Sequence, residues 1–183
     1  MTKKKITSNI SNKGFTLVEL LIVVAILGVL AAVGIVSFGG FLGNAKENAS
    51  RTNHKQVVQF IQASIMKCDM GGELILKHNP EIDTPDLCPT LRGEVFRSSY
   101  RSSTEDMTVR FVYHFSLSLK WCNAYGKMHD NGKTCEEGVE GGGIPGESGN
   151  LGVVKLIPDG TKIIIDTRVL ENEWITDRVE LVQ

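Results

Sequence analysis

Residues 13–42 read KGFTLVELLIVVAILGVLAAVGIVSFGGFL. This stretch decides the fold, because 21 of the 28 residues from Phe15 to Leu42 are apolar and Glu19 is the only charged one. As a helix, the uncharged part from Leu20 to Leu42 would be about 35 Å long, enough to cross the hydrocarbon core of a bilayer. A cytosolic enzyme with a single buried core is therefore not expected.

Charge on either side of this stretch predicts its orientation. The first 14 residues contain Lys3, Lys4, Lys5 and Lys13 and no acid, and positive charge beside an apolar run marks its cytoplasmic side. The full chain has 183 residues and a net charge of -1, but the part after residue 14 has 16 basic and 21 acidic residues, a net charge of -5. No basic footprint for nucleic acid is present, so no specific nucleic-acid partner is expected.

The position of Glu19 distinguishes three kinds of apolar segment. A cleaved secretory signal would be shorter and would end in a small-residue cleavage site. A plain single-pass anchor gives no reason for a carboxylate. Because ionisable groups inside membrane segments cost several kcal/mol unless they are paired, they usually mark function. The alternative is that Glu19 reaches the membrane interface and has no further role.

The stretch from Lys13 to Gly28 resembles the N-terminus of type IV pilins and the related pseudopilins, the class III signal. The resemblance covers under a quarter of the chain. It implies that a membrane-bound prepilin peptidase cuts after Gly14 and then N-methylates Phe15, while the apolar helix is retained. One departure is Val36, where many members of the family have proline.

The resemblance also implies a role for Glu19 in assembly. In the family, the matching carboxylate neutralises the N-terminal amine of a neighbouring subunit in the filament. An ammonium and a carboxylate in an apolar setting are each costly alone and tolerable together. We therefore expect Glu19 to pair with the methylated amine of Phe15 of another copy.

Five glycines interrupt the apolar segment, each costing a helix interior about 1 kcal/mol relative to alanine. They could let the helix unwind when it leaves lipid and packs in a filament, or they could let neighbouring helices approach closely. Both interpretations stay open for Gly28 and Gly34, whereas the adjacent Gly39 and Gly40 favour unwinding or a kink. The fifth is Gly43.

The helical pattern continues beyond residue 43 but becomes amphipathic. Apolar residues recur at Val57, Ile61, Ile65 and Cys68, and Gly71-Gly72 predicts the end of the helix. A continuous helix from Phe15 to Cys68 would be about 80 Å long. We expect its first half to lie in the membrane or filament core and its second half to pack on a folded head.

The rest of the chain predicts mainly loops and strands. We expect a connecting loop over Glu73–Ser103 and a hairpin of Leu151–Ile157 with Thr161–Val169, turning at Pro158-Asp159-Gly160. Trp174–Val182 is expected to be a third strand. This gives an α+β pilin fold in which a long N-terminal helix, half hydrophobic and half amphipathic, packs on a C-terminal antiparallel sheet.

Two segments are less clear. Met107–Trp121 alternates like a strand, yet it also has apolar residues spaced by four, and Thr104 followed by two acids resembles a helix start, so strand and helix both stay open. Gly138–Asn150 is expected to be a loop. Within it, Gly141–Gly146 matches G-x-G-x-x-G, but no convincing strand precedes it, so no dinucleotide site is expected.

The four cysteines, Cys68, Cys88, Cys122 and Cys135, predict two disulfides if the topology places them in an oxidising compartment. Three pairings are possible. Cys68–Cys88 with Cys122–Cys135 is favoured, because both loops are short. A metal site on Cys122, His129 and Cys135 is the alternative, but no C-x-x-C and no fourth ligand are evident.

Nothing in the sequence suggests catalysis. The four histidines, His54, His78, His114 and His129, form no H-E-x-x-H pair. We expect no catalytic residue, no bound metal and no cofactor, so the protein is not expected to be an enzyme.

The sequence predicts three regions: a cleaved cytoplasmic leader (1–14), a hydrophobic transmembrane or filament-core helix (15–43) and a globular head (44–183).

The resemblance implies a pilus subunit that waits in the bacterial inner membrane and then polymerises with itself into an extracellular pilus. Its partners would be prepilin peptidase, the assembly platform and the assembly ATPase. Adhesion or motility could follow. The rivals are a pseudopilin of type II secretion and a membrane-anchored periplasmic enzyme or binding domain.

Overall fold

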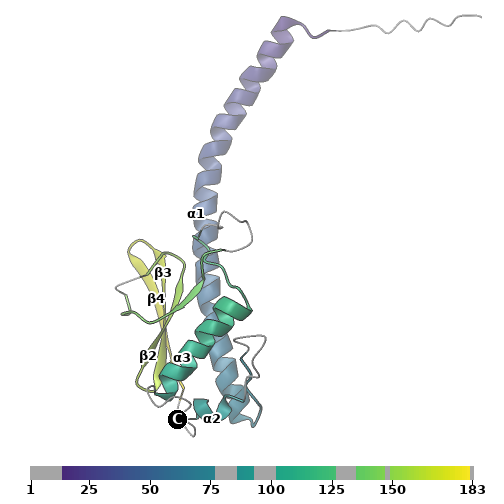
Figure 1. The fold of residues 1–183 in the computed structure, drawn as a ribbon. Helices are drawn as coiled ribbons and strands as arrows, with labels where there is room; N and C mark the ends of the chain where they lie inside the picture. The colour runs from purple at the N-terminus through teal and green to yellow at the C-terminus, as the bar shows by residue number, and fades with distance from the viewer. Residues whose placement is uncertain (1–13, 77–85, 93–101, 127–134, 147–148, 182–183) are drawn as a thin grey trace, which may run out of the picture. The chain divides into compact units, whose positions relative to one another are not determined.

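The computed structural model describes residues 14–76, 86–92, 102–126, 135–146 and 149–181. The chain divides into two compact units, one up to Leu42 and one from Gly43 onward. The second unit combines helices with a four-stranded sheet (Figure 1), so the predicted α+β class is confirmed. The elements are α1 (Leu17–Asp69), α2 (Cys88–Leu91), α3 (Ser103–Tyr113), η1 (His114–Ser118), β1 (Val139–Gly141), β2 (Val154–Asp159), β3 (Lys162–Leu170) and β4 (Glu173–Glu180).

Helix α1 begins two residues after the predicted start and ends one residue after the predicted end. Its C-terminus is closed by Gly71, whose φ of 78° is a conformation that favours glycine. The amides of Gly71 and Gly72 donate to the carbonyls of Cys68 and Lys67, which caps the last turn. The helix is regular through all five glycines of its apolar half, and unwinding during assembly stays a prediction.

The head half of α1 buries one face of the helix. The buried residues follow each other at intervals of three and four, which places them on one side. Val57, Ile61 and Cys68 are buried as predicted, whereas Ile65 is only half-buried. The other buried positions of this face are polar: Ser50, His54 and Ser64.

Helix α3 and η1 resolve the ambiguous segment as helical. The helix begins at a capping box in which the Ser102 hydroxyl accepts from the Glu105 amide at 3.2 Å and the Glu105 carboxylate accepts from the Ser102 amide at 2.8 Å. The start is therefore Ser102 and not Thr104. Of the apolar residues spaced by four, Met107, Phe111 and Phe115 are completely or almost completely buried in the core against α1. The fourth, Leu119, follows the end of η1 and is 45% exposed, so the expectation of a core position is wrong there.

The sheet corrects one part of the predicted fold. Strands β2, β3 and β4 form the predicted antiparallel meander, but β1 pairs with β2 in parallel, so the sheet is mixed and not antiparallel. Strand β1 lies inside the glycine-rich segment that we expected to be a loop. With only three residues it has too short an apolar pattern to be recognised, and it exists because its backbone pairs with β2, with Val139 opposite Val154.

The expected connecting loop over Glu73–Ser103 also contains a short helix, α2. The Asp86 carboxylate accepts from the amides of Leu74 at 2.8 Å and Cys88 at 3.0 Å, and so holds the start of α2 beside the segment that follows α1. Residues 77–85 and 93–101 of this segment lie outside the described residues.

Two disulfides fasten the head, in the pairing that the sequence favours. Cys68–Cys88 joins the last turn of α1 to α2, and Cys122–Cys135 closes the segment before β1. Since Cys122 and Cys135 are bonded to each other, they are not thiolate ligands, which argues against the metal alternative. The third proposed ligand, His129, and His78 lie outside the described residues.

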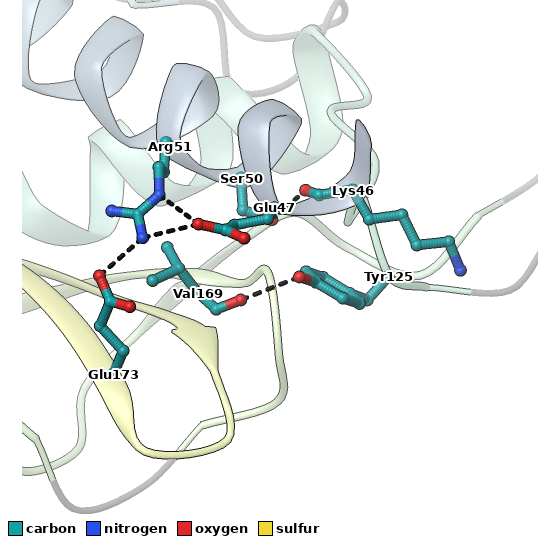
Figure 2. A network of polar contacts seen from close by, with 7 residues as sticks. All are labelled: Lys46, Glu47, Ser50, Arg51, Tyr125, Val169 and Glu173. Atoms are coloured by element: carbon teal, nitrogen blue, oxygen red, sulfur yellow. Dashed lines mark hydrogen bonds and ion pairs between the residues drawn. The ribbon is translucent and has the colours of Figure 1, made fainter. Parts of the chain in front are cut away.

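Polar contacts lie between the first turns of the head half of α1 and the start of β4, and between Tyr125 and β3 (Figure 2). The Arg51 guanidinium lies 2.8 Å from the Glu47 carboxylate, in the same helix, and 2.6 Å from that of Glu173 at the start of β4. The Tyr125 hydroxyl donates to the carbonyl of Val169 at 2.9 Å, and burial raises the pKa of this phenol. The Lys46 ammonium lies 5.8 Å from the Tyr125 ring centroid.

His54 provides the buried polar link between α1 and the sheet. Its side chain is 1% exposed, and its Nε2 lies 2.9 Å from Asp177 Oδ2 on β4. A carboxylate only accepts, so Nε2 carries a hydrogen, and in the neutral imidazole Nδ1 accepts from the Thr167 hydroxyl at 2.9 Å. One side chain therefore aligns α1 with both β3 and β4.

We predict that His54→Ala lowers the free energy of unfolding of the head by about 2–3 kcal/mol, because it leaves the buried Thr167 hydroxyl without a partner. Urea unfolding of the purified full chain in detergent, followed by tryptophan fluorescence, measures this. Gln59→Ala, on the exposed side of α1, is the control and should change stability by less than about 0.5 kcal/mol. Equal midpoints for the two variants would contradict the link.

We also predict that replacing both Cys122 and Cys135 by serine destabilises the head by about 3 kcal/mol. The reason is that the loop between these two residues is no longer closed in the unfolded chain, whose conformational entropy therefore rises. The same unfolding measurement tests it. A reduced wild-type chain should not be more stable than the double variant, and an unchanged urea midpoint in the double variant would show that the disulfide adds nothing.

Candidate functional site

The start of α1 is a capping box built from Thr16 and Glu19. The Glu19 Oε2 accepts from the Thr16 amide at 2.8 Å and from the Thr16 hydroxyl at 2.7 Å, and the same hydroxyl accepts from the Glu19 amide at 3.3 Å. The sequence Thr-Leu-Val-Glu is the pattern that produces this box. From the sequence, Glu19 was interpreted only as a charge in an apolar run. The cap that the same four residues encode was not predicted.

Gly14 and Phe15 precede the helix. Neither they nor Thr16 have helical structure, so the Gly14–Phe15 peptide bond lies outside the hydrogen-bonded backbone of α1. A Cβ added at Gly14 would meet nothing within 4 Å, and Phe15 is 87% exposed. Helix hydrogen bonds therefore do not hold this peptide bond, and the two residues that it joins are exposed.

The Glu19 carboxylate can accept more than its contacts with Thr16. An ionised carboxylate offers about four lone-pair sites, of which the capping box uses two. An ammonium group could therefore bind without breaking the cap. Pairing with Phe15 of another copy needs a second chain and stays a prediction.

Among the described residues of its unit, no side chain covers the apolar half of α1. Its large apolar side chains are exposed, from 49% at Val23 to 81% at Val36, and α1 is long and apolar enough to span a membrane. A helix that is apolar on all sides is stable only when lipid or other apolar helices surround it. This surface can therefore insert into a bilayer and, in other surroundings, associate with copies of itself.

The head shows no comparable chemical site. Within the described ranges, no group of three or more His, Cys, Asp or Glu side chains lies close enough to hold a metal ion. The glycine-rich Gly141–Gly146 follows a short edge strand and does not lead into a helix. Its Gly146 amide donates to the buried Asp166 carboxylate at 3.0 Å, which occupies a donor that a bound phosphate would need.

Comparisons with known proteins agree with this location of the site. The family model described as the prokaryotic N-terminal methylation motif matches residues 10–35. The Type IV major pilin protein PilA of Myxococcus xanthus (strain DK1622) is 51% identical over 47 residues, which cover 26% of this chain and 21% of that protein. The Type IV major fimbrial protein FimA of Dichelobacter nodosus is 33% identical over 64 residues, covering 35% and 41%.

The chain therefore spans only about a fifth to two fifths of the length of these relatives. No solved structure matches it. The methylation motif matches the N-terminal part of the chain, residues 10–35.

We predict that Thr16→Ala frays the first turn of α1, because it removes a cap that contributes about 0.5–2 kcal/mol. Amide hydrogen exchange of Glu19, whose amide donates to the Thr16 hydroxyl, should become about 2-fold to 30-fold faster in detergent micelles. Thr16→Ser retains the hydroxyl and should exchange like the wild type. Equal exchange rates in all three chains would mean that the capping box does not stabilise the helix start.

Proposed function

We propose, from its N-terminal methylation motif and its likeness to type IV major pilins, that this protein is a structural subunit of a type IV pilus. The observation that carries the proposal is the arrangement at the start of α1. A peptide bond after Gly14 lies just outside a capped helix, the helix is apolar and uncovered, and one carboxylate lies in its first turn.

The proposed sequence of events starts in the inner membrane. The basic leader (residues 1–14) stays in the cytoplasm, the helix from residue 15 to 43 spans the bilayer, and the head (44–183) lies on the other side. Prepilin peptidase cuts after Gly14 and methylates the new amine of Phe15. Since cleavage removes the leader and leaves the helix, the mature subunit keeps its apolar surface.

Assembly then replaces lipid by other copies of the same helix. The gain in burial is small, because lipid tails are as apolar as the helix that replaces them. External work from an assembly platform and its ATPase is therefore expected. The Glu19 carboxylate compensates the charge of the Phe15 amine of a neighbouring copy, which makes both charges tolerable in the filament core and fixes their axial register.

The head becomes the outer surface of the filament in this proposal. Two disulfides, one at the end of α1 and one before β1, suit a domain exposed outside the cell. This feature favours a pilus over the second candidate, a pseudopilin of type II secretion. The role of the chain is structural and not catalytic, and adhesion or motility would be properties of the assembled filament.

We predict different effects for two variants in cells that express this chain. Gly14→Val should accumulate uncut precursor, because a β-branched side chain obstructs the cleavage site, and should give no filaments. Glu19→Ala should be cut normally but yield at least about tenfold fewer filaments, since the buried amine loses its partner, a penalty of several kcal/mol. Immunoblots of precursor and mature chain and the mass of sheared filaments measure both.

Glu171→Ala, which removes a carboxylate at the exposed turn between β3 and β4, is the control and should assemble normally. Normal filaments from Glu19→Ala would refute the charge pairing. Sheared surface fractions that lack the wild-type chain would point to the pseudopilin instead. Unchanged localisation and function in Gly14→Val would point to a permanent membrane anchor.

A further inference from the structure

A groove lies between α3 and the end of β1. Its volume is about 530 Å³, within the range of about 300–1,000 Å³ that is typical of ligand pockets. Aliphatic and aromatic side chains form most of its walls, and one carboxylate lies among them. We call it the α3–β1 groove. Its lining includes Glu105, Val109, Val112 and Tyr113 of α3, Gly141 of β1 and Pro158 of β2.

Gly141 keeps the groove open on the side of the strand. A Cβ added there would lie 3.4 Å from Val112 Cγ2, so a larger side chain would fill the space between strand and helix. Gly141 lies in a strand and has no positive φ. The space beside this residue, and not its backbone conformation, is therefore what a side chain would change.

The backbone of Gly141 is placed to pair with an extended peptide. In the parallel ladder of β1 and β2, the Gly138 carbonyl and the Gly142 amide bond to β2, so the N–H and C=O of Gly141 point to the opposite side. In the described part of the chain, β1 is an edge strand, and Gly141 is exposed. Val139, which has the same orientation, is completely buried, so strand addition is limited to the end of β1.

Helix α3 adds apolar surface and negative charge to the groove. Val109 and Val112 are half-buried, and Tyr113 is 41% exposed. Among the described residues that line the groove, Glu105 is the charged one. Its carboxylate accepts from the Ser102 amide at 2.8 Å and retains lone pairs for a cation. The groove therefore suits a partner that combines an apolar side chain with a positive charge.

The spacing along α3 matches that of an extended peptide. Glu105 and Val109 are four residues apart, which is about 6 Å along the helix axis. Side chains two positions apart in an extended peptide lie on the same side, about 6.6 Å from each other. A lysine or arginine can therefore lie beside Glu105 while an apolar side chain two positions away lies beside Val109.

We propose that the α3–β1 groove binds an extended segment of a partner protein in which a basic residue and a large apolar residue are two positions apart. The apolar side chain fills the groove, the cation pairs with Glu105, and the peptide backbone bonds to Gly141. The chain passes from α3 into the π-helical η1 directly after Tyr113, and π-helical turns are frequent at functional sites. This binding does not require a filament, so its failure would leave the proposed function untouched.

The test uses the full chain in lipid nanodiscs and a fluorescein-labelled peptide, TKTLTKT, blocked at both ends. A lysine lies two positions from the leucine on either side, so both directions of binding are covered. Fluorescence anisotropy should show saturable binding with a submillimolar Kd. The peptides TETLTET and TKTGTKT should bind at least about tenfold more weakly, because the first places like charges together and the second buries no large apolar side chain.

Two variants of the chain test the two sides of the groove. Glu105→Gln keeps the capping box, since glutamine can also accept from the Ser102 amide, and should weaken binding by about 1.5-fold to 5-fold. Gly141→Val fills the groove and should weaken binding at least about tenfold. Glu171→Gln, at the exposed turn between β3 and β4, is the matched control and should bind like the wild type. Urea unfolding shows whether each variant is folded.

A photoreactive leucine in the same peptide locates the contact and should crosslink to residues 105–113 or 139–158. Crosslinks elsewhere would overturn the proposal, as would equal binding of the acidic peptide or wild-type affinity in folded Gly141→Val. Butylamine tests whether a lone cation is sufficient. Displacement of the peptide by an equal concentration of butylamine would identify a simple amine site and would also overturn the assignment to a peptide.

Discussion

The exposure of the apolar half of α1 is the constraint on which the rest of the structure depends. Among the described residues of its unit, no side chain covers this surface. Its contact with water is unfavourable, so lipid or other apolar helices would stabilise it. The N-terminal features follow from this need. The capping box closes the start of the helix, and one carboxylate lies in its first turn, where an amine in an apolar setting would need it.

The second half of α1 meets a different requirement, because it must hold a folded head. It does so with one buried face that contains both apolar and polar residues. Val57 and Ile61 contribute to the core, while His54 bonds to two strands and Arg51 reaches the start of β4. The exposed ion pairs of Arg51 contribute direction more than free energy, since such pairs add only about 0.2–1 kcal/mol.

Predictions from local pattern were right where the local signal was strong. The turn signal before β3, the glycines after α1 and the short spacing of the cysteines all correspond to features of the structure. Prediction was wrong or stayed open where contacts between residues far apart in the chain determine the secondary structure. Strand β1 has three residues and needs β2 beside it. Met107–Trp121 fits two periods, and the core contacts of Phe111 and Phe115 with α1 select the helix.

The sequence by itself determined the long helix, its apolar and amphipathic halves and the position of Gly14 and Glu19, because these depend on composition and on spacing within one helix. Only the tertiary structure decided the mixed sheet, the helical form of residues 103–118 and the role of His54. Those features depend on which residues far apart in the chain meet, and spacing along one segment carries no information about that.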